Sequence, residues 1–481
     1  MLEGPFPAGG VVRAVSDGTL FKSTEPAARA LAFQRAREAG ASLARITVDW
    51  RNVAAASPPA GFEPRDPSSP GYDFATLDAA VKGAVSAGLE PLLVVFHAPS
   101  FAEAPGRWPF AYPGSWAPQP AALEAFAAAL AARYDGSFPD PGAPGRSLPR
   151  VRLLQAWNEP NLARYLEPQW VVRNGRWAAF SPPLYRQMLD GFYRGVKSVA
   201  PGDEVVAAGV APNGERAGVG RMAPVTFLQG LLCLASPHAG ALVRAPGCSA
   251  PARLDALAFH PLSVGDPDLA ASSSLDVSIA DAAKVTRLLR AAERLRTVAP
   301  AGEKPVWVTE LNWESAPPAA DGVPARLQPA WISRALHRLW AAGVSLVAWQ
   351  FLADPFPGTT VATPTGGVRD YPRPAGLFTD PSGDLALSVA KQFVAGFSFP
   401  FDPLRVDRAH VRLWAVLDAP GERVEVLGRR PGGAWRVLAP ARAGADRIVN
   451  SLIALRGPWQ LRLRVPGALS PEASVGSRRS L

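Results

Sequence analysis

The sequence lacks several patterns that would assign it to a large class of protein. No run approaches the ~18 uninterrupted apolar residues that a membrane-spanning helix requires. HExxH, a Walker loop, GxGxxG after a strand and a GxSxG elbow are all missing, which argues against metalloprotease, nucleotide-binding and serine-hydrolase chemistry. The opening residues, MLEGPFPAGG, do not have the basic-then-apolar layout of a signal peptide. A secreted protein whose signal was removed and a cytoplasmic protein both stay open.

Cysteine and histidine are scarce. Cys233 and Cys248 bracket a loop-rich stretch and match no zinc signature, so a disulfide and two free thiols are equally open. Three of the five histidines, His238, His337 and His410, lack partners at ligand spacing, and we expect neither a metal nor a cofactor. The formal charge of +9 comes mostly from scattered arginines, which disfavours a nucleic-acid partner.

Short apolar runs alternate with longer segments of helical spacing through residues 1–397, as in βα units around a parallel sheet. Eight such units can be counted, which predicts an α/β fold, specifically a (β/α)₈ TIM barrel. The expected strands cover residues 10–15, 42–49, 90–97, 150–159, 204–211, 254–261, 305–311 and 345–352. The expected helices cover residues 25–40, 73–88, 120–134, 183–200, 276–299, 328–343 and 384–396.

From residue 398 the pattern changes to short alternating stretches, such as HVRLWAVL and WQLRLRV, separated by Pro, Gly and Asp turns. This change predicts a small antiparallel β accessory domain over residues 398–468. No flexible linker precedes it, so we expect it to pack on the barrel. Residues 469–481 are expected to form a disordered tail.

Carboxylates gather at two of the expected strand ends, where a TIM barrel carries its catalytic groups. Strand four ends in WNEPN, with Asn158 and Glu159, and strand seven ends in VTELNW, with Glu310. Cleavage of a glycosidic bond needs a proton donor and a second carboxylate, ~5 Å apart in retaining enzymes and nearer ~9 Å in inverting ones. The two glutamates could fill both roles.

These motifs resemble the clan A glycoside hydrolases, a group that includes families 5 and 39, and WNEPNL is especially similar to family 39. The resemblance spans residues 10–396. It implies that Glu159 is the acid/base, that Asn158 is the Asn preceding it, and that Glu310 is the nucleophile. Asn158 could bond the sugar 2-hydroxyl.

The resemblance extends to the neighbours of this pair. LARITVDW is similar to the second strand of the clan and implies that Arg45 holds Glu310 ionised, because a nearby positive charge favours the carboxylate. At the end of strand three, His97 matches a histidine that can contact the sugar. In strand six, His260 matches the histidine of a His-x-Tyr pattern.

Two tryptophans complete the predicted sugar site. Trp349 ends strand eight and matches the residue that floors the subsite of the cleaved sugar, as the resemblance implies. Trp313 follows strand seven, where its ring could cover the apolar face of a pyranose.

Leu262 departs from the pattern of the clan, because it stands where relatives often have a tyrosine that donates to the nucleophile. A loop tyrosine could replace it, Arg45 and His260 could suffice, or activity could be weak. The available loop tyrosines are Tyr72, Tyr112, Tyr165 and Tyr371.

Together these features predict a retaining glycoside hydrolase that cleaves an oligosaccharide or glycoside through a covalent glycosyl-enzyme. The alternatives are a non-catalytic carbohydrate-binding barrel and a transglycosylase with the same two glutamates. The expected rim loops, 51–73, 160–181 and 353–383, are long, which favours a walled pocket and exo-attack on a β-linked sugar. An open groove across the mouth would contradict that expectation.

Overall fold

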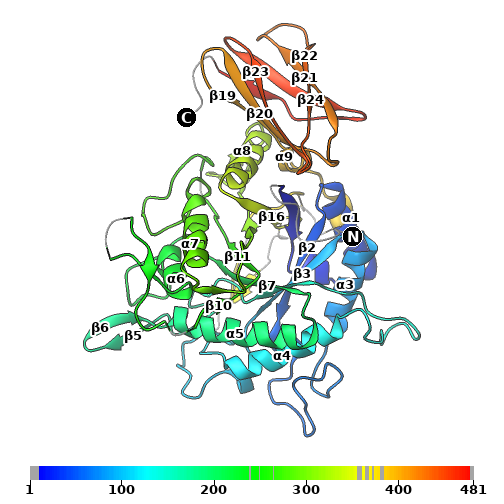
Figure 1. Cartoon of the computed structure of the whole chain (residues 1–481). Helices are drawn as coiled ribbons and strands as arrows, with labels where there is room; N and C mark the ends of the chain where they lie inside the picture. Colours follow the sequence, from blue (N-terminus) through cyan, green and yellow to red (C-terminus); the bar gives the residue numbers. More distant parts are fainter. Residues whose placement is uncertain are drawn as a thin grey trace.

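The computed structural model describes residues 10–237, 240–248, 250–263, 265–354, 360–362, 368–370, 373–379 and 384–476. Within them, eight parallel strands close into a barrel in the order β1-β16-β13-β11-β7-β4-β3-β2 (Figure 1). The barrel strands are β1 (Val12–Ser16), β2 (Leu43–Asp49), β3 (Glu90–Phe96), β4 (Leu153–Ala156), β7 (Glu204–Val210), β11 (Ala256–Phe259), β13 (Val306–Leu311) and β16 (Val344–Gln350). Each overlaps one of the expected ranges, so the predicted TIM barrel is confirmed.

Helices cover the outside of the barrel. The α-helices are α1 (Pro26–Glu38), α2 (Trp50–Val53), α3 (Ala75–Ser86), α4 (Pro120–Arg133), α5 (Ser181–Val199), α6 (Pro224–Leu231), α7 (Ala283–Arg294), α8 (Gln328–Ala341) and α9 (Gln392–Ser398). The 3₁₀ turns are η1 (Leu20–Lys22), η2 (Ser100–Ala102), η3 (Ile279–Asp281) and η4 (Leu385–Leu387). Helix α6 lies between β7 and β11, a connection for which no helical range was predicted.

Short strands decorate the connections. They are β5 (Trp170–Arg173), β6 (Arg176–Ala179), β8 (Leu234–Ala235), β9 (Val243–Arg244), β10 (Ala252–Arg253), β12 (Val298–Ala299), β14 (Ser315–Ala316), β15 (Val323–Pro324), β17 (Thr360–Ala362) and β18 (Val368–Asp370). Strands β5 and β6 form a hairpin in the long loop after β4. Cys233 and Cys248 form a disulfide, which decides between the two alternatives for them. None of the described helices is long and apolar enough to cross a bilayer.

The expected helix 384–396 is wrong over its first half. Asp384 caps the short turn η4 by accepting a hydrogen bond from the backbone of Ala386 at 2.9 Å. The chain then runs extended, because Ala390 forms a β-bridge with Phe378. These backbone groups bond to a neighbouring segment, so helix α9 begins only at Gln392.

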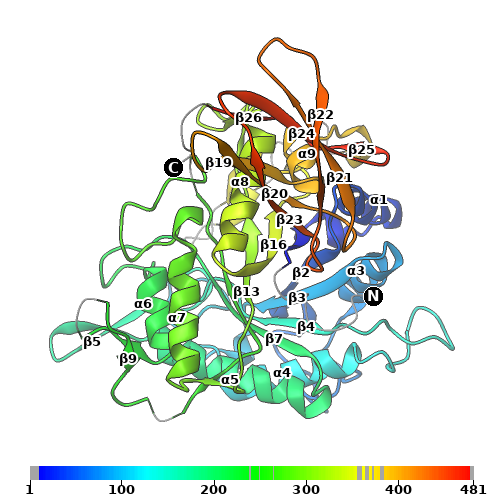
Figure 2. The same ribbon diagram turned by 45° about the horizontal axis from the view of Figure 1, so that its top comes forward.

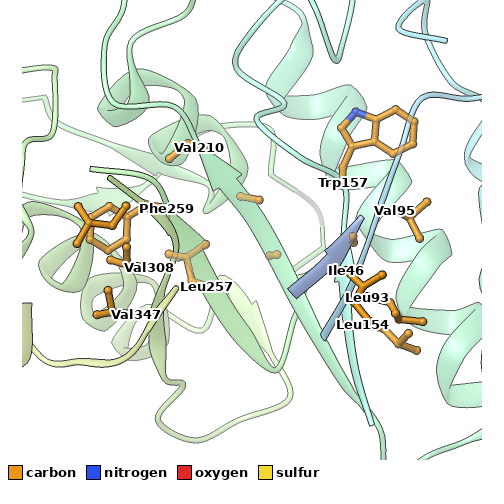
Figure 3. Packing of buried hydrophobic residues seen from close by; sticks show 14 of the residues in the cluster. Ile46, Leu93, Val95, Leu154, Trp157, Val210, Leu257, Phe259, Val308 and Val347 are labelled. Atoms are coloured by element: carbon orange, nitrogen blue, oxygen red, sulfur yellow. The ribbon is translucent and has the colours of Figure 1, made fainter. Parts of the chain in front are cut away.

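Side chains of the barrel strands alternate between two apolar environments, as the period of two requires. One set points outward and packs under the helices. Figure 3 shows members of this set, among them Leu93 and Leu154, which are paired in register across β3 and β4. The other set fills the lumen and includes Leu43, Leu153 and Trp307. This alternation decides which side chains reach the barrel mouth.

A C-terminal unit follows the barrel and forms two antiparallel sheets, β19-β20-β23 and β22-β21-β24-β25, with β26 paired to β24. Its strands are β19 (Phe401–Arg405), β20 (His410–Val416), β21 (Arg423–Arg429), β22 (Arg436–Arg442), β23 (Ile448–Ala454), β24 (Trp459–Val465), β25 (Ala468–Leu469) and β26 (Ala473–Val475). Apolar side chains between the sheets form a cluster of their own. Helices α8 and α9 lie between this unit and the barrel (Figures 1 and 2).

The unit packs directly on the barrel helices. Asp402 of β19 accepts hydrogen bonds from Arg334 at 2.9 Å and pairs with His337 at 2.6 Å, both on α8. Residues 473–475, expected to lie in a disordered tail, instead form β26, because Val475 is buried against the sheet core. The boundary between residues 397 and 398 stays a prediction.

Candidate active site

A polar layer covers the apolar lumen at the barrel mouth. Because strand side chains repeat every two residues, each residue two positions after a lumen-facing apolar one points into the same space. The residues that follow Leu43, Leu153, Ala258 and Trp307 in this way are Arg45, Gln155, His260 and Thr309. All four are at most 1% exposed. The barrel therefore buries a group of polar side chains that must satisfy one another.

Arg45 joins three strands at the centre of this layer. Its Nη1 donates to Oε1 of Glu310 at 2.8 Å and to Oγ of Ser16 at 3.2 Å. Its Nη2 donates to Oδ1 of Asn158 at 2.6 Å, which leaves the Asn158 amide NH₂ as the donor group of that side chain. The predicted contact between Arg45 and Glu310 is present. A buried guanidinium at this distance favours the charged form of a carboxylate.

Glu159 has different surroundings. Trp157 and Glu159, just after β4, have positive φ angles of 74° and 40°, a left-handed backbone that costs on the order of 1–3 kcal/mol for non-glycine residues. The Glu159 backbone N–H donates to the carbonyl of Gly209 at 3.1 Å. Burial raises the pKa of Glu159 to about 7, despite opposing charges on Arg45, Arg164 and Arg221. Near neutral pH this carboxyl can therefore hold a proton.

His260 lies between the two carboxylates. Its Nδ1 is 3.1 Å from Oε1 of Glu159 and 3.7 Å from Oε2 of Glu310, and its Nε2 is 2.9 Å from Oγ1 of Thr309. Burial lowers the pKa of His260 to about 4, with Glu310 opposing and Arg45 reinforcing the change. The imidazole is consequently neutral at ordinary pH.

One carboxylate oxygen of Glu159, one of Glu310 and a ring nitrogen of His260 all lie within 4.8 Å of one another. Among the described residues, this trio is the group that could surround a metal ion. Arg45 already bonds an oxygen of Glu310, so a cation entering here would meet a fixed positive charge. The short separation suits two carboxylates that act on one bond.

A cavity of about 380 Å³ opens beside Glu159. Leu262 lines it, together with loop residues that follow β7, β11 and β13. The lining is Glu159, Leu162, Ala211, Pro212, Asn213, Arg221, Leu262, Ser263, Gly265, Asn312, Trp313, Glu314, Asp321, Gly322, Val323 and Arg373. A volume near the lower end of the ~300–1,000 Å³ typical of ligand pockets suits a small ligand group.

Trp349 does not occupy its predicted place under the sugar. It is fully buried, its Nε1 donates to the carbonyl of Ala375 at 2.9 Å, and its ring centre lies 4.7 Å from that of Phe393. The alternation of β16 explains this, because Ala348 and its second neighbour Gln350 face inward while Trp349 points outward. The prediction was thus wrong by one residue of register.

Trp313 and His97 have different surroundings. Trp313 lines the cavity, with its Nε1 bonded to the carbonyl of Gly265 at 3.1 Å, so its role in sugar contact stays a prediction. The Nδ1 of His97 is 3.2 Å from Asp49, and its Nε2 is 3.3 Å from the backbone carbonyl of Arg164. Both ring nitrogens thus hold other groups, and the predicted contact of His97 with a sugar also stays untested.

Tyr165 is a buried loop tyrosine that interacts electrostatically with both carboxylates. Its ring stacks on His97 at 5.4 Å, and burial raises its pKa, with Glu159 and Glu310 adding to the effect. Tyr72 lies elsewhere, since its hydroxyl donates to the carbonyl of Pro64 at 2.7 Å. Tyr371 lies outside the described residues.

Thr309, Gln155 and Gly209 belong to the site but were not predicted from the sequence. The period of two could have indicated Thr309 and Gln155, because each follows a lumen-facing residue by two positions. Gly209 has a φ of +75°, and a Cβ there would lie 2.6 Å from Gln155 Nε2 and 2.9 Å from His260 Nε2. Only the folded arrangement reveals this need for glycine.

Several solved structures are similar to this chain. A family 39 glycoside hydrolase from Bacteroides cellulosilyticus WH2 matches with a TM-score of 0.51 and 16% identity over 92% of this chain and 80% of its own. A glucosidase from Croceicoccus marinus matches at 0.49, with 14% identity over 92% and 93%. A family 30 endoxylanase from Clostridium papyrosolvens C71 matches at 0.43, with 11% identity over 93% and 96%. We base the fold comparison on the first of these structures, because its TM-score is above 0.5. No protein-family model and no curated protein sequence matches the chain.

Proposed function

We propose that this protein is a retaining glycoside hydrolase, with Glu310 as nucleophile and Glu159 as acid/base. The observation that carries the proposal is the pair itself, with carboxylate oxygens within 4.8 Å in unlike surroundings. Retaining enzymes hold their carboxyl groups ~5–5.5 Å apart, whereas inverting enzymes leave ~6.5–9.5 Å for a water molecule. The shared fold with a family 39 glycoside hydrolase agrees with this chemistry.

In the first step, Glu310 attacks the anomeric carbon while Glu159 gives its proton to the leaving oxygen. Arg45 donates to the carboxylate of Glu310 and orients it, and burial keeps the proton on Glu159 until transfer. The C–O bond to the leaving group breaks as the bond to Glu310 forms. Asn158 can donate to the sugar 2-hydroxyl, an interaction that strengthens in the transition state.

In the second step, Glu159 has become a carboxylate and takes a proton from a water molecule. That water attacks the anomeric carbon from the side that the leaving group vacated, and the bond to Glu310 breaks. Two inversions give net retention of configuration. Glu159 returns to its protonated form with the free enzyme.

For the substrate, we propose exo-attack on the terminal residue of a β-linked glycoside. The small cavity beside Glu159 supports a short binding region rather than a long groove. Trp313 offers an aromatic wall to this cavity. The loop 353–383, expected to form another wall, lies partly outside the described residues.

The test is a screen of 4-nitrophenyl glycosides and polysaccharides with the wild type, Glu310→Ala and Glu159→Ala. We expect Glu310→Ala to lower kcat/KM by about 10⁴-fold or more, because the nucleophile is lost. Glu303→Ala is a matched control, since its side chain is 77% exposed and its ion pair with Arg290 contributes little. Equal cleavage by wild type and Glu310→Ala would overturn the assignment of the nucleophile.

Azide separates the roles of the two glutamates. With Glu159→Ala and an activated substrate, azide should attack the glycosyl-enzyme and give a glycosyl azide of retained configuration. With Glu310→Ala, azide should fill the space of the carboxylate and give the inverted azide. Products exchanged between the two variants would mean that the roles are reversed.

The two remaining alternatives predict different results in this screen. A transglycosylase would pass the sugar to an added sugar acceptor faster than to water, which product analysis with increasing acceptor measures. A non-catalytic barrel would cleave nothing in the screen but would bind an oligosaccharide with the same affinity in wild type and Glu310→Ala.

A further inference from the structure

Thr309 is a buried polar residue that the proposed mechanism does not use. It lies on β13 directly before Glu310 and is 0% exposed. Its Oγ1 is 2.9 Å from Nε2 of His260, and this is its one side-chain hydrogen-bond partner among the described residues. On the other side of the ring, Nδ1 is 3.1 Å from Oε1 of Glu159. A line of three groups therefore connects Thr309 to the acid/base.

The direction of these hydrogen bonds follows from counting donors. A neutral imidazole has one N–H donor and one acceptor nitrogen. If Nε2 carried the hydrogen, it would donate to Thr309, and the buried Thr309 hydroxyl would have no described acceptor for its own hydrogen. An unsatisfied buried donor destabilises the fold, because it loses its bonds to water without replacement. If the hydroxyl instead donates to Nε2, both groups are satisfied and Nδ1 carries the hydrogen.

The tautomer decides where Glu159 keeps its proton. An Nδ1–H group donates to Oε1 of Glu159, which favours Oε1 as the carbonyl oxygen and Oε2 as the oxygen that carries the acidic hydrogen. The other tautomer would present a bare Nδ1 to Oε1, and Glu159 would donate its proton to His260 instead of to a leaving group. Glu159 lines the cavity, and a proton on Oε2 is not shared with His260, so it can pass to a leaving group.

We infer that Thr309 is a positioning residue that fixes the Nδ1–H tautomer of His260 and so directs the acidic proton of Glu159 to Oε2. The same Nδ1–H bond stabilises the Glu159 carboxylate after it has lost that proton, which prepares it to accept one from water. No atom of Thr309 needs to touch the substrate. The consequence for catalysis rests on the proposed glycosidase function, but the tautomer itself does not.

NMR spectra of the imidazole nitrogens test the tautomer without any substrate. The chain has five histidines, and a His260→Gln variant assigns the signal of interest by its disappearance. We expect the wild-type signal to show a protonated Nδ1 and an unprotonated Nε2. A wild-type signal with the hydrogen on Nε2 would overturn the inference. An Nδ1–H signal from a protein that cleaves no glycoside would instead refute the proposed function alone.

Kinetics test the consequence through leaving groups of different basicity. Thr309→Val removes the hydroxyl and nearly keeps the shape, and Thr309→Ser keeps the hydroxyl. For glycosides with an alkyl leaving group, which need proton donation, we expect Thr309→Val to lower kcat/KM by about 10²-fold. For 2,4-dinitrophenyl glycosides of the same sugar, which need little help, we expect a loss of about threefold or less. Thr309→Ser should have the wild-type kcat/KM for both kinds of glycoside.

A merely structural role for Thr309 would lower kcat/KM by the same factor for both leaving groups, and that result would overturn the inference. So would a Thr309→Ser variant as impaired as Thr309→Val. Thermal unfolding of each variant accompanies the kinetics. If Thr309→Val does not fold, the wild-type nitrogen spectrum and the Thr309→Ser kinetics still decide the question.

Discussion

Two arginines, each 1% exposed, lie in different parts of the molecule and make different bonds. In the barrel mouth, Arg45 donates to side chains from separate strands, including the carboxylate of Glu310 at 2.8 Å. In the C-terminal unit, Arg405 donates to the backbone carbonyls of Leu455, Gly457 and Gly476. The first arrangement places a charge beside the carboxylates of the proposed active site, and the second ties loops together. Burial of a charge alone therefore does not identify a functional site.

The sharpest test of this comparison replaces each arginine with methionine. Arg45→Met should lower kcat/KM by about 10³-fold, because Glu310 loses its charged donor. It should also destabilise the fold by about 3–5 kcal/mol, since a buried carboxylate is left without its partner. Arg405→Met should lower the free energy of unfolding while kcat/KM stays within about twofold. Equal losses of activity in the two variants would show that the distinction is false.

The next test concerns the packing of the mouth. Gly209→Ala should lower kcat/KM by about 10²-fold, because the new methyl group would displace His260 or Gln155. Gly61→Ala is the matched control, with a similar φ of +79° but no atom within 4 Å of the new Cβ. Both variants carry the backbone strain of about 1–2 kcal/mol, which urea unfolding measures. If both variants lose activity equally, strain rather than displacement is responsible.

A third test uses the pKa of Glu159, which burial raises from 4.5 to about 7. The proton donor is needed for the first step, so kcat/KM should fall about tenfold per pH unit above that pKa. The folded state holds this proton more tightly than the unfolded state does. The bound proton on Glu159 therefore stabilises the fold fully at pH values below the pKa of the unfolded state. This stabilisation is lost as the pH rises through the pKa of the folded state.

The stability change can be measured with Glu159→Gln, which has no proton to lose. Between about pH 4 and about pH 8, the wild type should lose about 3 kcal/mol relative to this variant. Urea unfolding of both proteins at the two pH values measures the difference. A constant difference would mean that Glu159 titrates at its ordinary pKa.

The smallest expected effect concerns the tyrosine that Leu262 replaces. If the hydroxyl of Tyr165 assists the carboxylates from the loop after β4, Tyr165→Phe should lower kcat by about threefold to tenfold. Tyr72→Phe is the control, because its hydroxyl bonds to the distant carbonyl of Pro64. Indistinguishable rates in the two variants would show that Tyr165 does not replace the missing tyrosine.

The errors of prediction share a cause. Trp349 was placed in the mouth, but one residue of register decides which face of β16 a side chain takes. Residues 388–391 have a composition that permits a helix, yet backbone bonds to the segment around Phe378 hold them extended. Residues 473–475 were expected to be disordered, but an available edge of β24 pairs with them. In each case a partner distant in sequence outweighed the local preference.

The sequence by itself determined the barrel architecture, because strand alternation and helical spacing are local patterns. It also placed the two glutamates at strand ends, because each strand end is visible in a single short motif. The tertiary structure decided everything that depends on distance and burial. Arg45 and Glu310 are 265 residues apart along the chain but 2.8 Å apart in space. The raised pKa of Glu159 and the bonds of His260 likewise arise from closure of the barrel, which excludes water and brings strands from across the chain to one mouth.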